Sequence, residues 1–145
     1  MFKALALVAA LVVATPVLAQ TADDVNSQID TVLGPHEIYQ TAVETIQKAL
    51  AEGNIDGVAG YIPFGEPIKV NGEDVVIADE ADLNDQFETL FNDKVIHAVT
   101  EQDYGSLFVN QDGIMFGDGE LWLTGVCLDD TCADVFVNIS AINNE

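Results

Sequence analysis

Cys127 and Cys132 are the two cysteines of the chain, and their type and spacing allow three kinds of chemistry. A pair of thiols can form a disulfide, exchange electrons or bind a metal ion. Four residues separate this pair, so the spacing is not the C-x2-C of redox and zinc motifs, and the sequence holds no second pair of ligands. Two cysteines in an exported chain favour a structural disulfide, which we predict here.

The two histidines could act as general bases or as metal ligands. His97 falls inside a long helical pattern, and as a base it would need a cavity-facing position and a carboxylate partner. We expect a partly exposed side chain there instead. His36 stands at the start of another helical pattern, and we expect it on the surface. The spacing of His, Cys and Asp fits neither a metal site nor a catalytic triad, so the sequence predicts no metal and no cofactor.

Acidic residues outnumber basic ones by a wide margin. The chain has 25 Asp and Glu against four lysines, a formal charge of −21, and the loss of Lys3 with an export signal would make it −22. Such a charge argues against binding to nucleic acid or to an anionic membrane. The Asp-Gly pairs at 112–113 and 118–119 suggest calcium, but they lack EF-hand spacing and are common in turns. We interpret the acids as a solvated surface.

Residues 1–19 show the three parts of a secretory signal peptide. Lys3 supplies the positive charge, residues 4–13 the apolar stretch, and the small residues before Gln20 the cleavage pattern. The apolar stretch is shorter than the roughly 20 residues of a spanning helix, and we expect no membrane insertion after cleavage. The sequence therefore predicts a mature chain that begins at Gln20 and lies in the periplasm or outside a bacterial cell.

Helical periodicity dominates the first part of the mature chain. Residues 20–35 form a leader whose order the pattern leaves open, although its apolar spacing allows a short helix. The first main helix is predicted over residues 36–52, and Asn54 caps a short second helix. Residues 79–102 are the longest helical segment, which Asn92 can divide into two helices. The apolar stripe of the first main helix comprises Tyr39, Ala42, Val43, Ile46, Ala49 and Leu50.

Strand patterns follow the short helix and fill the end of the chain. The Asn-Gly pair at 71–72 is a strong hairpin signal, and its register places Lys69 opposite Asp74 in a hairpin over residues 67–77. The Gly-Asp-Gly stretch at 117–119 predicts a bulge or a bend within a longer strand. The last three strands are predicted over residues 107–110, 114–127 and 132–142.

The two cysteines predict the register of the last two strands. If they lie opposite one another, Trp122 pairs with Val137, and we expect helices to cover the face that carries this pair. The opposite face would then hold Leu121, Leu123 and Phe136, with no further helix left to cover it. Because exposed apolar patches mark contact surfaces, we predict a homodimer through this face.

The order of helix, short helix, hairpin, long helix and three strands resembles the nuclear transport factor 2-like superfamily of cystatin-like cones, which includes the SnoaL and ketosteroid isomerase types. Residues 51–61 are similar to the family's first helix-to-helix turn, in which Gly-Asp or Gly-Asn precedes a short helix that ends in an aromatic residue. Residues 107–122 are similar to exported, uncharacterised bacterial members. The resemblance implies one α+β domain over residues 36–145, with a curved antiparallel sheet wrapped against the N-terminal and central helices around a pocket.

The resemblance does not imply one function, because the superfamily holds isomerases, cyclases, dehydratases and plain binding modules. Its isomerase branch needs a carboxylate base on the strand after the short helix, where this chain has Lys69, with Glu66 nearby. We therefore expect an exported, noncatalytic domain that binds a small apolar ligand or a partner. The alternative is a small-molecule isomerase or cyclase that uses the cone pocket. The residues expected at this pocket are Tyr39, Tyr61, Phe87, Phe91, His97 and Trp122.

Overall fold

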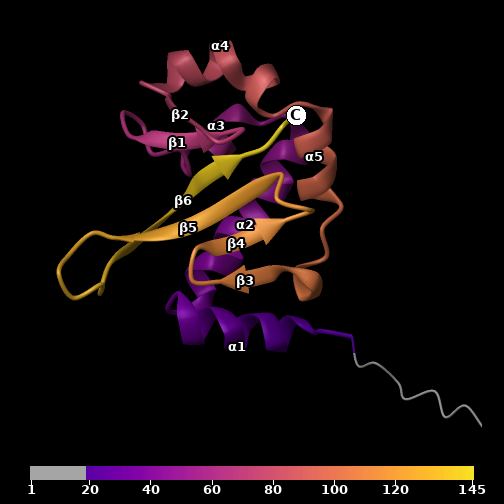
Figure 1. The fold of residues 1–145 in the computed structure, drawn as a ribbon, viewed down its shortest axis with the longest axis vertical. Helices are drawn as coiled ribbons and strands as arrows, with labels where there is room; N and C mark the ends of the chain where they lie inside the picture. Colours follow the sequence, from indigo (N-terminus) through magenta and orange to yellow (C-terminus); the bar gives the residue numbers. More distant parts are fainter. Residues whose placement is uncertain (1–18) are drawn as a thin grey trace, which may run out of the picture.

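The computed structural model describes residues 19–145 (Figure 1). The predicted export signal, residues 1–19, lies outside the described residues except for Ala19. None of the described helices is long and apolar enough to cross a membrane. The helices are α1 (Ala22–Val32), α2 (His36–Glu52), α3 (Ile55–Ala59), α4 (Glu80–Leu90), α5 (Asp93–Thr100) and the 3-10 turn η1 (Tyr104–Ser106). The strands are β1 (Pro67–Val70), β2 (Glu73–Val76), β3 (Phe108–Asn110), β4 (Gly113–Phe116), β5 (Leu121–Cys127) and β6 (Val135–Ile142).

The strands form a six-stranded sheet in the order β2-β1-β6-β5-β4-β3, and the fold is α+β. Neighbouring strands are antiparallel except β1 and β6, which run parallel where Lys69 pairs with Ala141 and Val70 with Ile142. The expectation of an antiparallel sheet throughout is therefore wrong at this pair. Parallel strands need a long crossover connection, and α4, α5 and four strands lie between β1 and β6 in the chain.

Helix α2 has the predicted bounds and the predicted buried face. It ends where Gly53 takes a left-handed φ of 64°. The six residues of its apolar stripe are the six buried residues of the helix. They belong to the same core as Leu121, Leu123 and Ile139 of the sheet, which have no exposed surface. Burying one such side chain contributes roughly 1.5–3 kcal/mol, so the packing of α2 on the sheet is a major source of stability.

Side-chain caps fix where the later helices begin. Asn54, Asp79 and Asn92 occupy the N-caps of α3, α4 and α5, and each accepts a hydrogen bond from a backbone amide in the first turn. At α5 the bond runs from the Val95 N–H to Asn92 Oδ1 at 3.2 Å. The predicted division of residues 79–102 into two helices at Asn92 is therefore confirmed.

The hairpin of β1 and β2 has the predicted register. Lys69 lies opposite Asp74, and its Nζ is 2.8 Å from Asp74 Oδ1. Asn71, in the turn, adopts a positive φ of 50°, a conformation that Asn tolerates better than most residues. Both ends of the ion pair are more than half exposed, so the pair adds well under about 1 kcal/mol and the turn fixes the register.

Gly117 and Gly119 reverse the chain where the sequence predicts a bulge or a bend within one strand. The strand predicted over residues 114–127 is in fact two antiparallel strands, with Met115 of β4 opposite Trp122 of β5. Gly117 and Gly119 have φ of 60° and 113°, which glycine adopts without steric cost. The Gly119 N–H closes the turn on Phe116 O at 3.1 Å. Two left-handed positions so close together turn the chain back, whereas a single one suits a bulge.

The register of β5 and β6 differs from the prediction by three residues from Leu123 to Cys127, because Cys127 lies opposite Val135 and not opposite the other cysteine. A bulge between Trp122 and Leu123 makes the difference four residues at Trp122, which lies opposite Ala141. A shift by an odd number turns a strand over relative to its neighbour. Leu121 and Leu123 therefore face the helices and are fully buried, while Phe136 lies on the other face. The prediction that these three residues share an exposed face is wrong.

Helix α1 lies along β3 at one edge of the sheet (Figure 1). It begins at a capping box in which Thr21 and Asp24 exchange hydrogen bonds. Val25 and Ile29 have no exposed surface and belong to the common core. The leader thus contains the short helix that its spacing allowed, and this helix covers the end of the sheet where an open edge strand would otherwise invite association.

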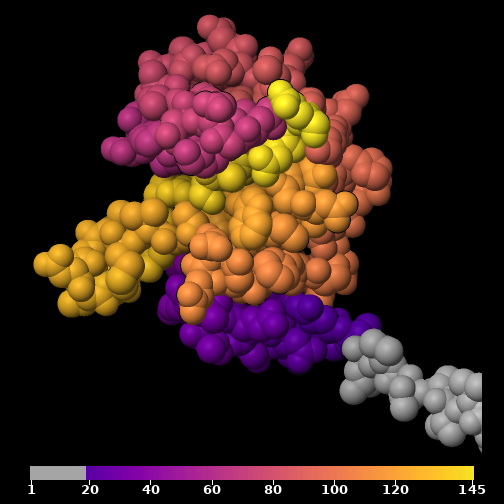
Figure 2. Space-filling view, viewed as in Figure 1, coloured from indigo at the N-terminus to yellow at the C-terminus, as the bar shows by residue number. Residues whose placement is uncertain are grey.

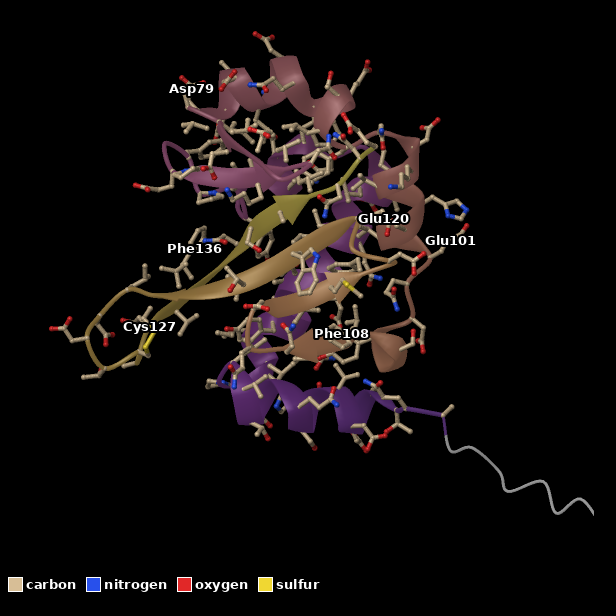
Figure 3. All side chains as sticks on the ribbon, in the orientation of Figure 1. Asp79, Glu101, Phe108, Glu120, Cys127 and Phe136 are labelled. Carbon is tan, nitrogen blue, oxygen red and sulfur yellow. A yellow bond between two sulfur atoms is a disulfide. The ribbon has the colours of Figure 1, made fainter. Side chains whose placement is uncertain are left out.

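The tips of β5 and β6 project from the body as an arm, formed by residues 126–136 (Figure 2). The predicted disulfide between Cys127 and Cys132 is present at this arm (Figure 3). It does not join the two strands, since Cys132 belongs to the connecting loop. Asp129 holds that loop: its Oδ1 accepts from Thr131 N at 2.7 Å and its Oδ2 from Asp134 N at 3.1 Å. A disulfide is compatible with an extracellular location.

Candidate functional site

The six residues expected at a pocket are spread over separate parts of the fold. Tyr39 and Phe91 are core side chains, each 1% exposed. Phe91 packs against Phe87 with ring centroids 5.0 Å apart. Tyr61 is partly buried next to the core, and Trp122 lies on the sheet face turned away from α2. The aromatic residues assigned to a cavity therefore mainly build or border the core.

His97, the sixth residue, does have a carboxylate partner. Its Nε2 lies 3.0 Å from Glu101 Oε1, one helical turn further along the chain. The two side chains are 72% and 66% exposed, which agrees with the expected surface position. Such a pair is open to water, so it lacks the enclosure that would tune a general base.

A groove of about 780 Å³ lies on the outer face of the sheet, defined as the face that carries Trp122, Thr124 and Asn138. Its volume falls within the roughly 300–1,000 Å³ of small-molecule sites. One side is the segment 62–68, which joins α3 to β1, and the other is the outer face of β5 and β6. Its lining includes Phe64, Glu66, Thr124, Phe136, Asn138 and Ser140.

The groove exists because residues 62–66 do not pair with β6, although they lie between two points that bond to it. Ile139 N of β6 donates to Tyr61 O at 2.8 Å, but β1 pairs with β6 only from Lys69 onward. Residues 62–66 between these points form turns in place of a strand. Gly65, with φ of 81°, allows this path, and its N–H donates to Ile77 O at 2.9 Å. The missing strand residues leave the outer face of β6 uncovered beside the segment.

Asn138 is the polar side chain most deeply set in this groove. It is 6% exposed and is the one buried polar residue among the described residues. It lies opposite Thr124 across the two strands. Within residues 19–145 its amide has no hydrogen-bond partner, and no fully enclosed side-chain atom is left unpaired, so the amide's remaining exposure is to the groove. Because the amide atoms keep some exposure, they can form hydrogen bonds with a ligand or with water in the groove.

The charge in the groove lining is negative. Glu66 is the charged residue of its lining, and neither lysine nor histidine contributes to it. Of the three described lysines, Lys69 pairs with Asp74 at 2.8 Å and Lys94 with Glu120 at 3.6 Å. Ser140 Oγ donates to Trp122 O at 3.4 Å, which leaves the Asn138 amide and the Thr124 hydroxyl to meet a ligand. The lining is otherwise apolar.

Trp122 belongs to an apolar row that crosses the outer face next to the groove. Phe108 lies opposite Met115, and Met115 lies opposite Trp122. The rings of Phe108 and Trp122 meet edge to face with centroids 6.4 Å apart, and Phe108 is 51% exposed. Figure 3 shows Phe108 and Phe136 on different parts of the sheet. Phe108 thus exposes apolar surface on the sheet where the predicted Leu121 and Leu123 do not, and Val76 and Val126 are also exposed, at 50% and 46%.

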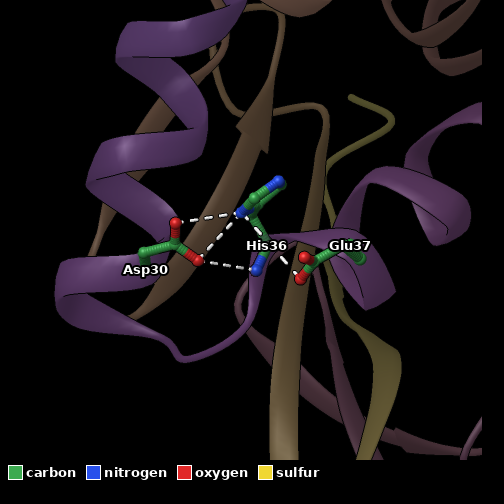
Figure 4. Close-up of side chains that lie close together, drawn as sticks. All are labelled: Asp30, His36 and Glu37. Atoms are coloured by element: carbon green, nitrogen blue, oxygen red, sulfur yellow. Dashed lines mark hydrogen bonds and ion pairs between the residues drawn. The ribbon is translucent and has the colours of Figure 1, made fainter.

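Asp30, His36 and Glu37 form a second cluster, at the junction of α1 and α2 (Figure 4). His36 Nδ1 lies 2.9 Å from Asp30 Oδ2 and 3.9 Å from Glu37 Oε2. Asp30 also accepts the His36 backbone N–H at 2.9 Å, and these hydrogen bonds lower the pKa of its carboxyl. One atom from each side chain could contact a small cation, but Asp30 already serves as the cap that α2 otherwise lacks. The position of His36 at the surface agrees with the prediction.

The fold and the groove define the class: an α+β domain with a mixed six-stranded sheet and an apolar groove on its outer face. Comparisons with protein-family models, curated proteins and solved structures find no match to the chain. The groove is therefore the feature of the chain that bears most directly on its function. Sequence reasoning missed Asn138 because only its burial distinguishes it, and the signal was an amide between Val137 and Ile139 in an apolar strand.

Proposed function

We propose that this chain is an exported, noncatalytic domain that binds a small apolar ligand in the groove beside β6. The observation that carries the proposal is Asn138, which is 6% exposed, makes no side-chain hydrogen bond within residues 19–145 and lines a largely apolar groove. Ligand sites typically combine apolar walls with a few well-placed polar groups. The amide would orient the ligand, and Phe64 and Phe136 would cover its apolar body.

Export is proposed from two independent features. Residues 1–19 carry the pattern of a signal peptide, and the Cys127–Cys132 disulfide suits an oxidising compartment. Intact-mass measurement of protein secreted by a bacterial host tests this, with Gln20 as the expected first residue. A mass that still includes Met1 would contradict cleavage.

Membership of the nuclear transport factor 2-like superfamily is part of the same proposal. Its support is the element order, in which a main helix and a short helix precede a hairpin, two further helices and the last strands. An isomerase or cyclase of this type needs an enclosed carboxylate base. The carboxylate in the groove lining is Glu66, which is exposed to solvent. Binding without chemistry is the simpler role for this lining.

Self-association is a second candidate role, favoured by the row of Phe108, Met115 and Trp122 on the outer face. Replacing Phe108 with Asp places a charge in the row, and we expect it to abolish a dimer seen by sedimentation at moderate salt. Val76→Asp is the matched control, because Val76 is 50% exposed at the other end of the sheet. A wild type that stays monomeric at high micromolar concentration would contradict this role.

Ligand binding is tested with the uncharged fluorescent probe N-phenyl-1-naphthylamine. We expect saturable binding that is lost in Thr124→Trp, because the indole fills the groove next to Asn138. Thr100→Trp on α5 is the control for added aromatic surface and should bind as the wild type does. Absence of saturable binding to the wild type, or equal binding by Thr124→Trp, would refute the groove as the site.

A further inference from the structure

We infer that the groove selects ligands whose polar end is uncharged or cationic and rejects carboxylates. This inference rests on the proposed function and adds the chemical class of the ligand. It follows from three properties of the lining: which polar groups are free, which charges are present and which charges are absent.

The free polar groups recognise a hydroxyl, a carbonyl or an amine. The Asn138 amide supplies an acceptor oxygen and donor hydrogens, and it lies opposite the Thr124 hydroxyl. Ser140 is occupied by its bond to Trp122 O at 3.4 Å. An alcohol or ketone can exchange hydrogen bonds with the amide, whose atoms keep some exposure at the groove. Such a ligand needs no charge from the protein.

A carboxylate would meet no positive partner in this groove. A charged group loses its hydration on entering an apolar site, and this is costly unless an opposite charge is present. Glu66 is instead negative, and among the described residues no lysine, arginine or histidine lines the groove. The nearest lysine in sequence, Lys69, is held by Asp74 at 2.8 Å. The charge of −21 over the whole chain repels anions further.

An amine, by contrast, would find a partner at the groove. Glu66 is exposed, so its attraction for an ammonium group is that of a surface ion pair. Such pairs contribute about two- to fivefold in affinity. The inference therefore orders three ligands that share one apolar body: an amine binds at least as well as the alcohol, and both bind better than the carboxylate.

The experiment displaces N-phenyl-1-naphthylamine with decylamine and decanoate below their micellar concentrations and with 1-decanol below its solubility limit. Salt near 0.15 M screens distant charges, since the Debye length is then about 8 Å. We expect decanoate to bind at least about tenfold more weakly than decanol, as for a buried charge without a partner. Equal or tighter binding of decanoate would overturn the inference while the proposed function stands. Failure of the naphthylamine probe itself would overturn the proposed function.

Matched variants separate the groove from the overall charge. Glu66→Gln should remove the amine's advantage over decanol, and Glu66→Lys should strengthen decanoate. Glu73 is exposed on β2, outside the groove lining, so Glu73→Lys changes the net charge equally and should leave the order unchanged. If Glu73→Lys strengthens decanoate as much as Glu66→Lys, the preference comes from net charge and the inference fails. Asn138→Leu should weaken decanol while leaving the uncharged naphthylamine bound.

Discussion

The hydroxyl of Tyr39 lies directly against Gly125 of β5, where it donates a hydrogen bond to Leu33 O at 3.2 Å. A Cβ at position 125 would overlap this hydroxyl and lie 2.8 Å from Val135 Cγ1. Overpacking of this kind costs about 1–3 kcal/mol. We therefore expect Gly125→Ala to lower the free energy of unfolding by that amount, measured by urea denaturation.

Two comparisons keep this prediction specific. Gly60→Ala is the control, because a Cβ there has nothing within 4 Å, and its stability should change by less than about 0.5 kcal/mol. Tyr39→Phe removes the overlapping oxygen, so the double variant with Gly125→Ala should regain part of the loss. If Gly125→Ala and Gly60→Ala prove equally stable, Tyr39 does not constrain this position.

Local patterns in the sequence were enough to predict α2 and the β1–β2 hairpin. The buried residues of α2 recur at helical spacing, so the sequence of the helix alone identifies its buried face. The Asn71 turn fixes the hairpin register within four residues. The register of β5 and β6 could not be read in this way. The cysteines suggested a cross-strand pair, whereas Asp129 folds residues 128–134 into a longer loop through hydrogen bonds to backbone amides. The spacing of apolar residues gives no information about such hydrogen bonds.

Replacing Asn138 with Leu is expected to stabilise the protein. Asn138 is 6% exposed and its amide makes no hydrogen bond within residues 19–145, so its removal loses no protein hydrogen bond, and leucine adds apolar contact in a largely apolar groove. A gain of about 1 kcal/mol in the urea-derived free energy of unfolding is the expected result. Residues kept for binding often reduce stability in this way.

The same substitution at Asn92 provides the contrast. Asn92 accepts from Val95 N at 3.2 Å and donates to Asn144 O at 2.9 Å. Loss of this cap and tether should cost about 1 kcal/mol or more. If Asn138→Leu is destabilised as much as Asn92→Leu, the amide has a structural partner and the groove loses its main support.

The candidate site could not be predicted from the sequence, and the reason is physical. Asn138 lies about seventy residues from the segment 62–66, and only the tertiary fold brings them together. The alternation of β6 did place Asn138 on the face away from Ile139. What the pattern could not show is that Tyr61 O accepts a hydrogen bond from Ile139 N of β6, while residues 62–66 form turns and strand pairing begins only at Lys69.

The loop of the arm should be sensitive to acid through Asp129. Hydrogen bonds from the Thr131 side chain, and then from the backbone amides of Asp134, Thr131 and Ala133, lower the pKa of this carboxyl from 3.8 to about 2. Because the folded pKa is depressed, the contribution to loop stability is complete above about 3.8 and is lost as pH falls towards 2. Carboxyl titration by NMR should show this low midpoint.

Thr131→Val isolates the largest cause of that shift. It removes the hydroxyl that donates to Asp129 Oδ1 at 2.6 Å, so the pKa of Asp129 should rise towards its ordinary value. Thr41→Val is the control, since the Thr41 hydroxyl donates to Glu37 O within α2 and should leave the Asp129 titration unchanged. An Asp129 midpoint near 3.8 in the wild type would show that the loop bonds do not form in solution.

Removing the disulfide should cost little and act only on the arm. Cys127 and Cys132 are five positions apart, and closing so short a loop stabilises by at most about 2 kcal/mol in the chain-entropy model. Cys132 pairs with no residue of β5, so the register from Leu121 to Cys127 depends on strand pairing alone. We expect the double Cys→Ser variant to unfold cooperatively at a modestly lower temperature and to bind N-phenyl-1-naphthylamine as the wild type does. Thiol titration of unfolded, unreduced wild type should find no free thiol, and two free thiols would show that the bond is not formed.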